Sequence, residues 1–561
     1  MYHFNHKKLF SVSVGAISLA FSLNLQGAQA QSTEITETPV QVVAPEAAVD
    51  APVVLTYEEQ LAQAVKDAMA TAGQDFVDFY ATRDFRPVWA TAGNKTLLQL
   101  LTFIESAPDH ALPLARYNTG AIEAAWNGSS APADVAALEL AAAQSYVQFA
   151  KDLHAGMLNP RSINKEMNAE WRVPETATVL AAVADAADKG AVYKTLQPSS
   201  YEYPLMMAEL KRLEQIVADS SEGKLVPSGR TLRPGQSNDR VVVLRARLQE
   251  LGYDVPDMGS PAYDDGIIAA VKAFQADAGL NTDGLVGPKT LAAINAGPKQ
   301  HLKQVAVNLE RLRWMNFDLG KRHIYVNIPD YMATVVDEGK PTLSFRVVVG
   351  RRSHQTAEFS DVMTHMVANP SWNVPMSIAS KEYLPKLQAD PTTLARQGIQ
   401  MRVRGTGEVV DSTMVDYTQY STGNFPFVLK QTPGRHNALG RVKFMFPNKY
   451  NIYLHDTPSR SLFNRDARAY SHGCVRVQKP MDLAYTLLSL QEDDPKSYFD
   501  SILATRRETQ IDLAEPIPVH IVYRTAWFDK DGKINYRADI YGRDKLVFKA
   551  LTKAGVTIPG L

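Results

Sequence analysis

The sequence predicts an α+β chain of several domains, helical in its first half and rich in β-strands in its second. The chain has 561 residues, which is too long for a single hydrophobic core. Apolar residues recur at helical spacing from Tyr57 to about Ala218. From Arg322 onward, stretches such as "RHIYVNIPDYMATVVD" and "TLSFRVVVG" alternate or run apolar with Val, Ile, Tyr and Phe, as strands do.

The first thirty residues have the composition of an export signal. Two lysines precede an apolar run from Leu9 to Leu25, and Ala28-Gln29-Ala30 has the small-x-small form of a cleavage site. We expect a signal peptide over residues 1–30 and a flexible linker over residues 31–56, rich in Ala, Pro, Val, Thr and Glu. A membrane anchor is the alternative, but serines interrupt the run and no second apolar segment of about 18 residues follows.

The charge balance and the single cysteine each limit the functions that the chain can have. With 59 Lys and Arg against 60 Asp and Glu, the chain has no net field that would attract nucleic acid, so a nucleic-acid partner is disfavoured. Cys474 is the single cysteine. Exported proteins normally use cysteines in pairs, so an odd one is either a reactive thiol or an intermolecular partner.

Two helical segments come first. Residues 57–230 are predicted to form an α-helical scaffold domain, with Leu61, Val65 and Met69 as an example of its spacing, and they carry no concentrated chemistry. Residues 232–297 are predicted to form a small three-helix domain. Asp239 is the expected cap of its first helix, and Pro288 opens its third. Such a compact unit favours a binding module, with an inert spacer as the alternative.

The β-rich segment is expected over residues 302–525. Gly and Asn-Pro turn signals break it into short strands, which favours an antiparallel or mixed, sandwich-like sheet. We expect few helices, about Leu302 to Trp314 and Met481 to Leu490. The strand pattern lapses over about residues 376–424, which indicates an inserted lid or a plain surface insertion. The sequence does not decide where the extension 526–561 packs.

The thiol lies in the run Ser471-His472-Gly473-Cys474-Val475-Arg476. Gly473 permits the backbone angles that let consecutive N–H groups converge on one point. Such a nest could hold the oxyanion formed when a thiolate attacks a carbonyl. Arg476 could lower the pKa of the thiol or dock a carboxylate. The arrangement suits acyl transfer.

A nucleophilic cysteine also needs a base within hydrogen-bond reach. His455 ends the predicted strand in "NIYLHDTPS", 16 positions before Ser471, so a returning loop can bring both to one end of the sheet. A backbone carbonyl such as that of Asp456 could orient the ring. Two readings compete. Cys474 could be a small inert hydrophobe, or His455, His472 and Cys474 could bind zinc for a hydrolase.

Two stretches resemble known families. "HDTPSRSLFNRDARAYSHGCVRV" resembles the signature of the L,D-transpeptidase (YkuD-like) family, with a histidine, a 15-residue spacer over residues 456–470, and Ser-His-Gly-Cys before an aliphatic residue and Arg. "LRPGQSNDRVVVLRARLQELGY" and "AVKAFQADAGLNTDGLVGPKTLAAIN" resemble the peptidoglycan-binding domain of bacterial wall enzymes. The whole order resembles the larger, multidomain Gram-negative members of the transpeptidase family.

The resemblance implies roles for particular residues. Cys474 would be the acyl-accepting nucleophile and His455 the proton acceptor and donor. The backbone from His472 to Cys474 would form the oxyanion hole, with Gly473 at its centre. The substrate-contacting residues would be Ser471, Arg476, Asp456 and Trp372, the last within "ANPSWNVPMSIA". Ala357 departs from the family's usual proline, a local strand detail that leaves the site unaffected.

The implied reaction needs no cofactor and no metal. Cys474 would attack the carbonyl after the third-position diaminopimelate of a tetrapeptide stem and expel the terminal D-Ala. The side-chain amine of a second stem's diaminopimelate would complete a 3→3 cross-link. The resemblance also implies a periplasmic, wall-associated protein, acylation by carbapenems, and other wall-synthesis enzymes as partners. An L,D-carboxypeptidase, attachment of a protein lysine to the wall, and a non-catalytic wall-binding scaffold stay open.

Overall fold

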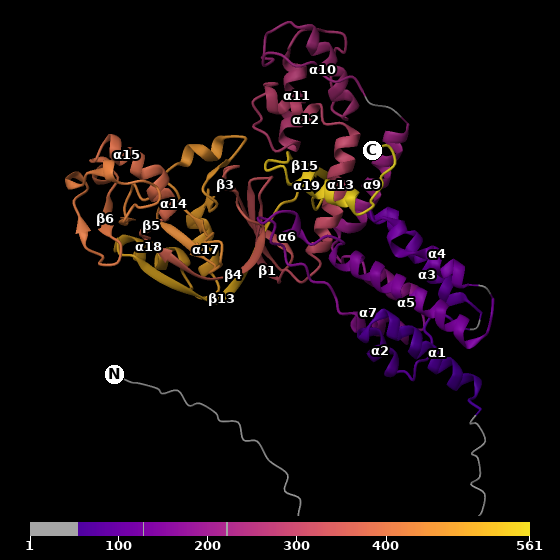
Figure 1. Ribbon diagram of the computed structural model, residues 1–561. Helices are drawn as coiled ribbons and strands as arrows, with labels where there is room; N and C mark the ends of the chain where they lie inside the picture. The colour runs from indigo at the N-terminus through magenta and orange to yellow at the C-terminus, as the bar shows by residue number, and fades with distance from the viewer. Residues whose placement is uncertain (1–53, 92, 127, 220–222) are drawn as a thin grey trace, which may run out of the picture. The chain divides into compact units, whose positions relative to one another are not determined.

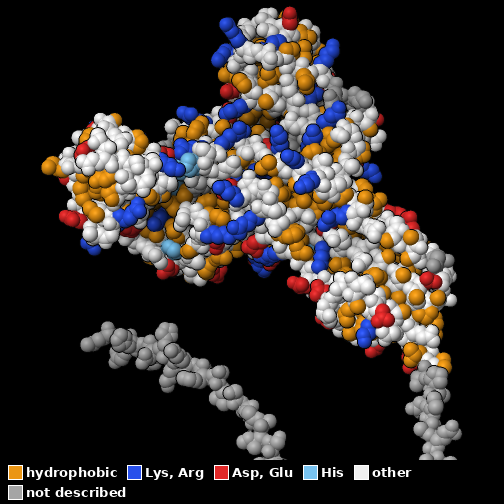
Figure 2. All heavy atoms as spheres, in the orientation of Figure 1, with side chains coloured by type: hydrophobic (Ala, Val, Ile, Leu, Met, Phe, Trp, Pro, Cys, Tyr) orange, Lys and Arg blue, Asp and Glu red, His pale blue; other side chains and the backbone are white. Residues whose placement is uncertain are grey.

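A computed structural model of the chain describes residues 54–91, 93–126, 128–219 and 223–561. Residues 55–561 form one compact unit, whose helices and strands are shown in Figure 1. The predicted signal peptide lies outside the described residues, as does the predicted linker up to residue 53. On the face drawn in Figure 2, Lys and Arg side chains gather across the middle, with Asp and Glu toward the edges. Positive and negative side chains are therefore not evenly mixed on this face, although the net charge of the chain is near zero.

The first segment of the described chain is helical, as expected. Thr56 caps the first helix in a capping box with Glu59, which satisfies its free N–H groups. The elements are α1 (Tyr57–Ala72), α2 (Gln74–Ala81), α3 (Lys95–Glu105), η1 (Ala107–His110), η2 (Leu114–Tyr117), α4 (Thr119–Ala125), α5 (Pro132–Ala155), α6 (Pro160–Ile163), α7 (Thr176–Ala184), α8 (Lys189–Thr195) and α9 (Glu202–Ala218).

The β-rich segment contains a nine-stranded mixed sheet within the described residues, in the order β11-β3-β12-β10-β9-β4-β13-β1-β2, and β2 also pairs with β3. The strands are β1 (Arg322–Asn327), β2 (Met332–Asp337), β3 (Lys340–Gly350), β4 (Phe359–Ala368), β9 (Val442–Met445), β10 (Leu454–His455), β11 (Ala469–Ser471), β12 (Val475–Val477) and β13 (Thr509–Val522). The predicted α+β class and the mixed sheet are confirmed. The helices between β9 and β13 are η6 (Arg460–Asn464), α17 (Pro480–Leu488) and α18 (Pro495–Ala504), of which only α17 was predicted.

The lid is larger and more regular than the sequence predicts. It has its own core and a four-stranded sheet in the order β5-β8-β6-β7. Its elements are β5 (Trp372–Val374), α14 (Met376–Ile378), the π-helical turn η3 (Ala379–Tyr383), α15 (Leu384–Ala389), α16 (Thr393–Arg396), β6 (Ile399–Val403), β7 (Val409–Val410), η4 (Ser412–Met414), η5 (Tyr417–Gln419) and β8 (Phe427–Gln431). Strands of two to five residues are too short to show a clear alternation, which explains why the strand pattern of the sequence lapses over about 376–424.

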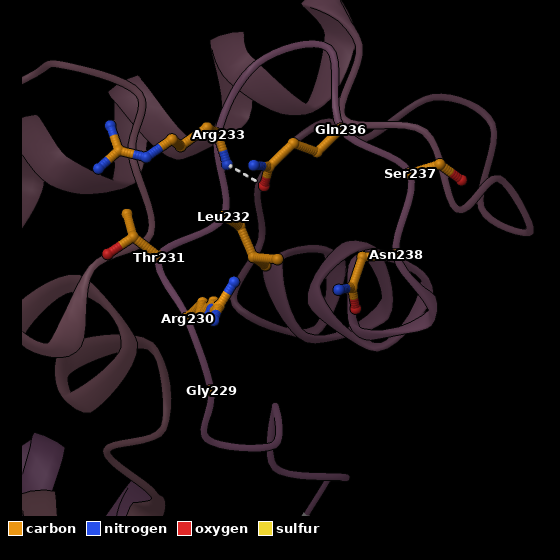
Figure 3. Close-up of a pocket in the computed structure, with 8 residues that line it drawn as sticks. All are labelled: Gly229, Arg230, Thr231, Leu232, Arg233, Gln236, Ser237 and Asn238. Atoms are coloured by element: carbon orange, nitrogen blue, oxygen red, sulfur yellow. Dashed lines mark hydrogen bonds between the residues drawn. The ribbon is translucent and has the colours of Figure 1, made fainter.

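The small module has the three predicted helices, α10 (Asp239–Glu250), α11 (Asp265–Asp277) and α12 (Pro288–Ile294). The cap of α10 is Asn238 rather than Asp239, because the Asn238 side chain accepts the Arg240 N–H at 2.9 Å and both residue types favour this position. A pocket of about 770 Å³ opens beside the start of α10, lined by residues 229–233 and 236–238. Figure 3 shows its polar wall.

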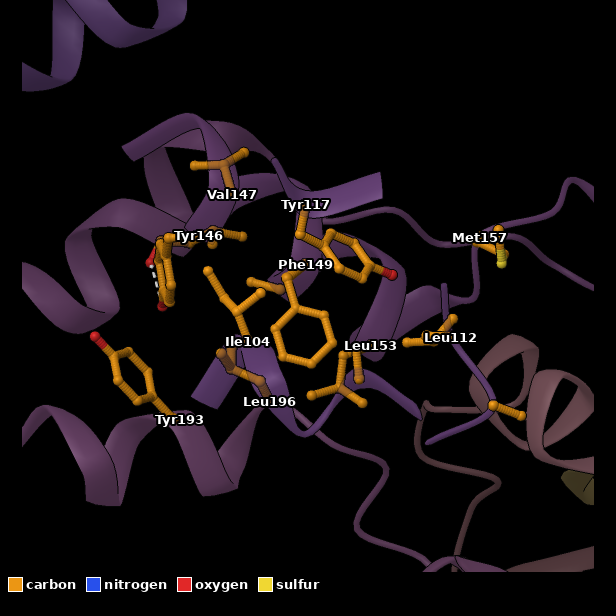
Figure 4. Close-up of a cluster of buried hydrophobic side chains, with 14 of the residues drawn as sticks. Ile104, Leu112, Tyr117, Tyr146, Val147, Phe149, Leu153, Met157, Tyr193 and Leu196 are labelled. Atoms are coloured by element: carbon orange, nitrogen blue, oxygen red, sulfur yellow. Dashed lines mark hydrogen bonds between the residues drawn. The ribbon is translucent and has the colours of Figure 1, made fainter. Parts of the chain in front are cut away.

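The helical core draws on three separate stretches of the chain. Figure 4 shows part of it, where Phe149 and Leu153 of α5 lie beside Ile104. Helix α13 (Pro298–Trp314), expected at the start of the β-rich segment 302–525, buries its apolar side chains in this core instead. The extension 526–561 also packs there, through β14 (Ala526–Phe528), β15 (Ile534–Tyr536) and α19 (Arg543–Lys553). The β-rich fold itself begins at Arg322.

Candidate active site

The thiol and the predicted base lie on neighbouring strands. β10 runs parallel to β12, with Leu454 opposite Val475 and His455 opposite Arg476. Adjacent strands are about 4.8 Å apart, and alternate residues of a strand share a face. Cys474 directly precedes Val475 and so falls opposite Tyr453, which places Cys474 and His455 on the same face of the strand pair, diagonally across from each other.

Burial governs the state of the thiol. The Cys474 Sγ–H donates to the Asn451 carbonyl at 3.5 Å. Burial raises the pKa of the Cys474 thiol to about 11, although hydrogen bonds to Tyr453 and the charge of Arg476 act in the opposite direction. The thiol is therefore protonated at neutral pH and needs a base before it can attack.

His455 is suited to be that base. Its side chain is buried, and Nδ1–H donates to the Asp456 carbonyl at 2.5 Å. Burial, helped by the charge of Arg476, lowers the pKa of His455 to about 3. A neutral ring whose Nδ1 carries the proton has its lone pair on Nε2. The expected carbonyl partner of the ring is present.

The Asp456 carboxylate holds the loop rather than pointing into the site. It accepts the backbone N–H of Arg441 at 2.8 Å and of Thr457 at 2.7 Å, and pairs with Arg460 at 3.1 Å. The contribution of Asp456 to the site is its backbone carbonyl. The predicted substrate contact by this residue finds no support in its side-chain bonds.

The turn that carries the thiol is tightly bonded. Gly473 has φ +121°, a conformation that side-chain-bearing residues rarely adopt. The Ser471 hydroxyl donates to the Cys474 carbonyl at 2.6 Å and accepts the Gly473 N–H at 3.1 Å. The Thr356 hydroxyl donates to the Gly473 carbonyl at 2.7 Å. Ser471 thus shapes the turn, and the Gly473 N–H is engaged within it.

His472 points away from the thiol turn toward the lid. Its Nε2 lies 2.5 Å from Glu382 Oε1 and 2.9 Å from Arg351 Nη2. Arg351 also donates to Glu382 Oε1 at 2.8 Å. Within the described residues no group of three or more His, Cys, Asp and Glu side chains could hold a metal ion. The zinc alternative built on His472 therefore gains nothing from this geometry.

Arg476 and Trp372 differ in position. Arg476 is half-buried, and its Nε is buried without a hydrogen-bond partner in the described part of the chain. Its charge lowers the pKa of both Cys474 and His455. An unpaired guanidinium beside the thiol can accept an anionic group. Trp372 lies on β5, packs against the core of the lid, and has its ring 6.5 Å from that of Tyr383.

Sequence reasoning missed three residues of the site. Tyr453 is hydrogen-bonded through its side chain to Cys474, and its ring lies 5.7 Å from that of His455. Its position two residues before His455 was a usable signal, because alternate residues of a strand share a face. Glu382 and Arg351 gave no such signal, since 90 positions separate Glu382 from His472.

Three family models match the chain. Residues 321–508 match the L,D-transpeptidase catalytic domain, YkuD. Residues 74–210 match a scaffold domain, and residues 237–294 match a "Putative peptidoglycan binding domain". The β-rich fold with the thiol turn is thus an L,D-transpeptidase catalytic domain of the YkuD family. The chain joins it to a peptidoglycan-binding domain, which indicates association with the cell wall.

Two curated relatives are similar to parts of the chain. A "Putative L,D-transpeptidase" of Haemophilus influenzae is 36% identical over 246 residues, which are 44% of this chain and 49% of the relative. "N-acetylmuramoyl-L-alanine amidase CwlL" of Bacillus licheniformis is 32% identical over 102 residues, 16% of this chain and 28% of the relative. The chain therefore spans about half or less of the length of these curated relatives.

Solved structures add little beyond the class. The L,D-transpeptidase from Xylanimonas cellulosilytica (residues 123–326) has 14% identity and a TM-score of 0.17, covering 53% of this chain and 99% of that one. L,D-transpeptidase 3 from Mycobacterium tuberculosis, in complex with a faropenem-derived adduct, has 10% identity and a TM-score of 0.18, covering 36% and 60%. TM-scores this low support no conclusion about the fold of this chain.

Among the helices that the structure describes, none has the length and apolar composition that a membrane span needs.

Proposed function

We propose that the chain is a peptidoglycan L,D-transpeptidase that forms 3→3 cross-links through an acyl-enzyme on Cys474. The observation that supports this proposal is the parallel register of β10 and β12, in which the neutral, carbonyl-bonded His455 and the protonated Cys474 fall on one face of neighbouring strands. Because the ring is neutral, the lone pair on its Nε2 can accept the thiol proton and later return it, which acyl transfer requires.

The first half-reaction forms a thioester. His455 Nε2 takes the thiol proton as Cys474 Sγ attacks the carbonyl after the third-position diaminopimelate. The tetrahedral intermediate collapses, the C–N bond to the terminal D-Ala breaks, and His455 gives its proton to the leaving amine. The Gly473 N–H already donates to the Ser471 hydroxyl, so the Cys474 backbone N–H and the Tyr453 hydroxyl are the candidate donors to the oxyanion.

The second half-reaction transfers the acyl group. The side-chain amine of a second stem's diaminopimelate attacks the thioester and loses a proton to His455. The C–S bond breaks, and the proton returns to the Cys474 sulfur. Arg476, with its unpaired Nε, is the candidate partner of a stem carboxylate. The lid would exclude water and favour the amine as acceptor.

The other parts of the chain would deliver the substrate. The predicted signal peptide would export the protein to the periplasm, and the peptidoglycan-binding domain would hold wall polymer near the site. The pocket beside α10, with Arg230 and Arg233 on its rim, is a candidate contact for the anionic stems. Other wall-synthesis enzymes are candidate partners. The domain limits 57–230, 232–297 and 302–525 remain proposals. The start of the last one changes, because α13 packs in the helical core and the β-rich fold begins only at Arg322.

Incubation of the purified protein with disaccharide-tetrapeptide, followed by separation of the products, tests this function. A 3→3 dimer with released D-Ala supports transfer. Tripeptide alone would indicate an L,D-carboxypeptidase, and no turnover would favour a wall-binding scaffold. Cys474→Ala and His455→Ala should each lose the product, while His436→Ala, on an exposed histidine outside the site, should keep it. Activity that survives Cys474→Ala would contradict the thiol mechanism.

A further inference from the structure

One contact joins the lid to the turn that carries the thiol. Glu382 belongs to the π-helical turn η3 of the lid, and its carboxylate meets His472, two residues before Cys474. Arg351 follows β3 and bonds the same carboxylate oxygen, while its backbone N–H donates to the Ser471 carbonyl at 2.9 Å. A single lid side chain is therefore bonded to His472 of the thiol turn and to Arg351, whose backbone N–H is bonded to the start of the same turn.

The setting of Glu382 fits a specific contact. π-helical turns are rare and occur mostly at functional sites. Burial raises the pKa of Glu382, but hydrogen bonds from His472 and Arg351 outweigh it, so its pKa lies below the usual range. The carboxylate therefore stays ionised while it bonds the two partners. The Glu382 side chain is 32% exposed, so the contact lies at the edge of the lid and can open to water.

The opposite end of the lid is held by a different residue. The Asn437 side-chain amide donates to the Pro370 carbonyl and to the Thr432 carbonyl, each at 2.9 Å. Pro370 precedes the first strand of the lid, and Thr432 follows the last. Asn437 thus clasps the two connections of the lid to the large sheet. With this end clasped, the Glu382 contact is a point at which the lid can close on the thiol turn or open from it.

We propose that Glu382 is a positioning residue whose carboxylate, carried by the lid, fixes His472 and through it the Cys474 backbone N–H that receives the oxyanion. Closure of the lid then also orders the thiol turn for acylation. This inference rests on the proposed acyl transfer at Cys474 and adds to it the element that orders the turn. Its effect falls on oxyanion stabilisation, which depends on backbone position, and not on the thiolate itself.

Two reactions of Cys474 separate these effects. Acylation by imipenem builds an oxyanion at the attacked carbonyl, whereas alkylation by iodoacetamide needs only the thiolate. In Glu382→Ala we expect imipenem acylation, followed by intact-protein mass, to slow by ~10-fold to ~100-fold, as a misplaced catalytic group does. Iodoacetamide alkylation at the same pH should not slow. Glu382→Gln keeps the Oε1 acceptor and should recover most of the acylation rate.

The neighbouring exposed Lys381 supplies the matched control. Lys381→Ala alters the same turn without touching His472 and should acylate like the wild type. Equal acylation by Glu382→Ala and the wild type would overturn the inference, and so would a parallel loss of acylation and alkylation. Imipenem needs no stem peptide. If the wild type acylates but does not convert tetrapeptide, the proposed cross-linking fails while the role of Glu382 is still decided.

Discussion

At the scale of single residues, the site rests on two neutral partners. Burial drives the pKa of Cys474 up and that of His455 down, and the charge of Arg476 is not enough to ionise the thiol. Many cysteine nucleophiles instead form a thiolate–imidazolium pair, in which the thiol pKa falls to about 3–4. In the proposed mechanism the thiol proton therefore moves to His455 during the attack, which couples deprotonation to catalysis.

The pH dependence of alkylation tests this state. Because the pKa of Cys474 is raised to about 11, its thiolate fraction should grow ~10-fold per pH unit from pH 7 to pH 9. The rate with iodoacetamide should rise in proportion, with no plateau in this range. A small thiol of ordinary pKa, measured in parallel, should level off above about pH 8.5. A flat rate for Cys474 from pH 5 to pH 8 would show a preformed ion pair instead.

Residues close in sequence were predictable, and residues brought in from afar were not. His455 and Cys474 could be found because a strand ending and a glycine-containing turn mark their positions, and the Asp456 carbonyl is adjacent in the chain. Tyr453 was within reach of the same alternation. Glu382 could not be found, because its partner lies 90 positions away and a half-buried glutamate has no local pattern.

At the scale of elements, the thiol turn and the lid matter most. The turn needs the positive φ of Gly473, since the Ser471 and Thr356 bonds close around it. The lid could not be predicted in detail because its strands have at most five residues. The longer strands of the large sheet, such as β3 and β13, show the apolar runs that made the β-rich segment predictable.

Gly473→Ala should weaken both stability and activity. An added Cβ meets only the Gln355 carbonyl at 3.7 Å, so the cost is backbone strain of about 1–3 kcal/mol in the free energy of unfolding. Imipenem acylation should also slow, because the oxyanion donors shift. Gly405→Ala is the control: φ is +98° with open space around it, in the lid. It should lose similar stability and keep the acylation rate. Equal acylation by both variants would contradict this role of the turn.

At the scale of the whole molecule, the chain's C-terminal segment closes a core begun near its start. Leu551 and Val547 of α19 are fully buried in the helical core, together with Leu309 of α13. Such contacts between distant stretches have no sequence signal, so the sequence left the packing of 526–561 open.

The peptidoglycan-binding module also contacts the catalytic domain. The Asn281 N–H donates to Asp466, in the loop between His455 and Ser471, at 2.6 Å.

Leu551→Ala should therefore destabilise the helical core. Removal of a fully buried leucine side chain costs about 2–5 kcal/mol through lost burial and a residual cavity. Chemical denaturation followed by far-UV circular dichroism should show an earlier first transition. Lys549→Ala, on an exposed position of the same helix, should leave that transition in place. Identical midpoints for the two variants would mean that α19 does not stabilise this core.

The central claim is that Cys474 carries the acyl group of the donor stem. Rapid acid quenching of the purified protein with disaccharide-tetrapeptide, followed by intact mass and peptide mapping, measures this directly. We predict one disaccharide-tripeptide group per chain, on the peptide that contains Cys474, with one D-Ala released for each group and no adduct in Cys474→Ala. Release of D-Ala with no adduct on the wild type, or an adduct that persists in Cys474→Ala, would contradict the account.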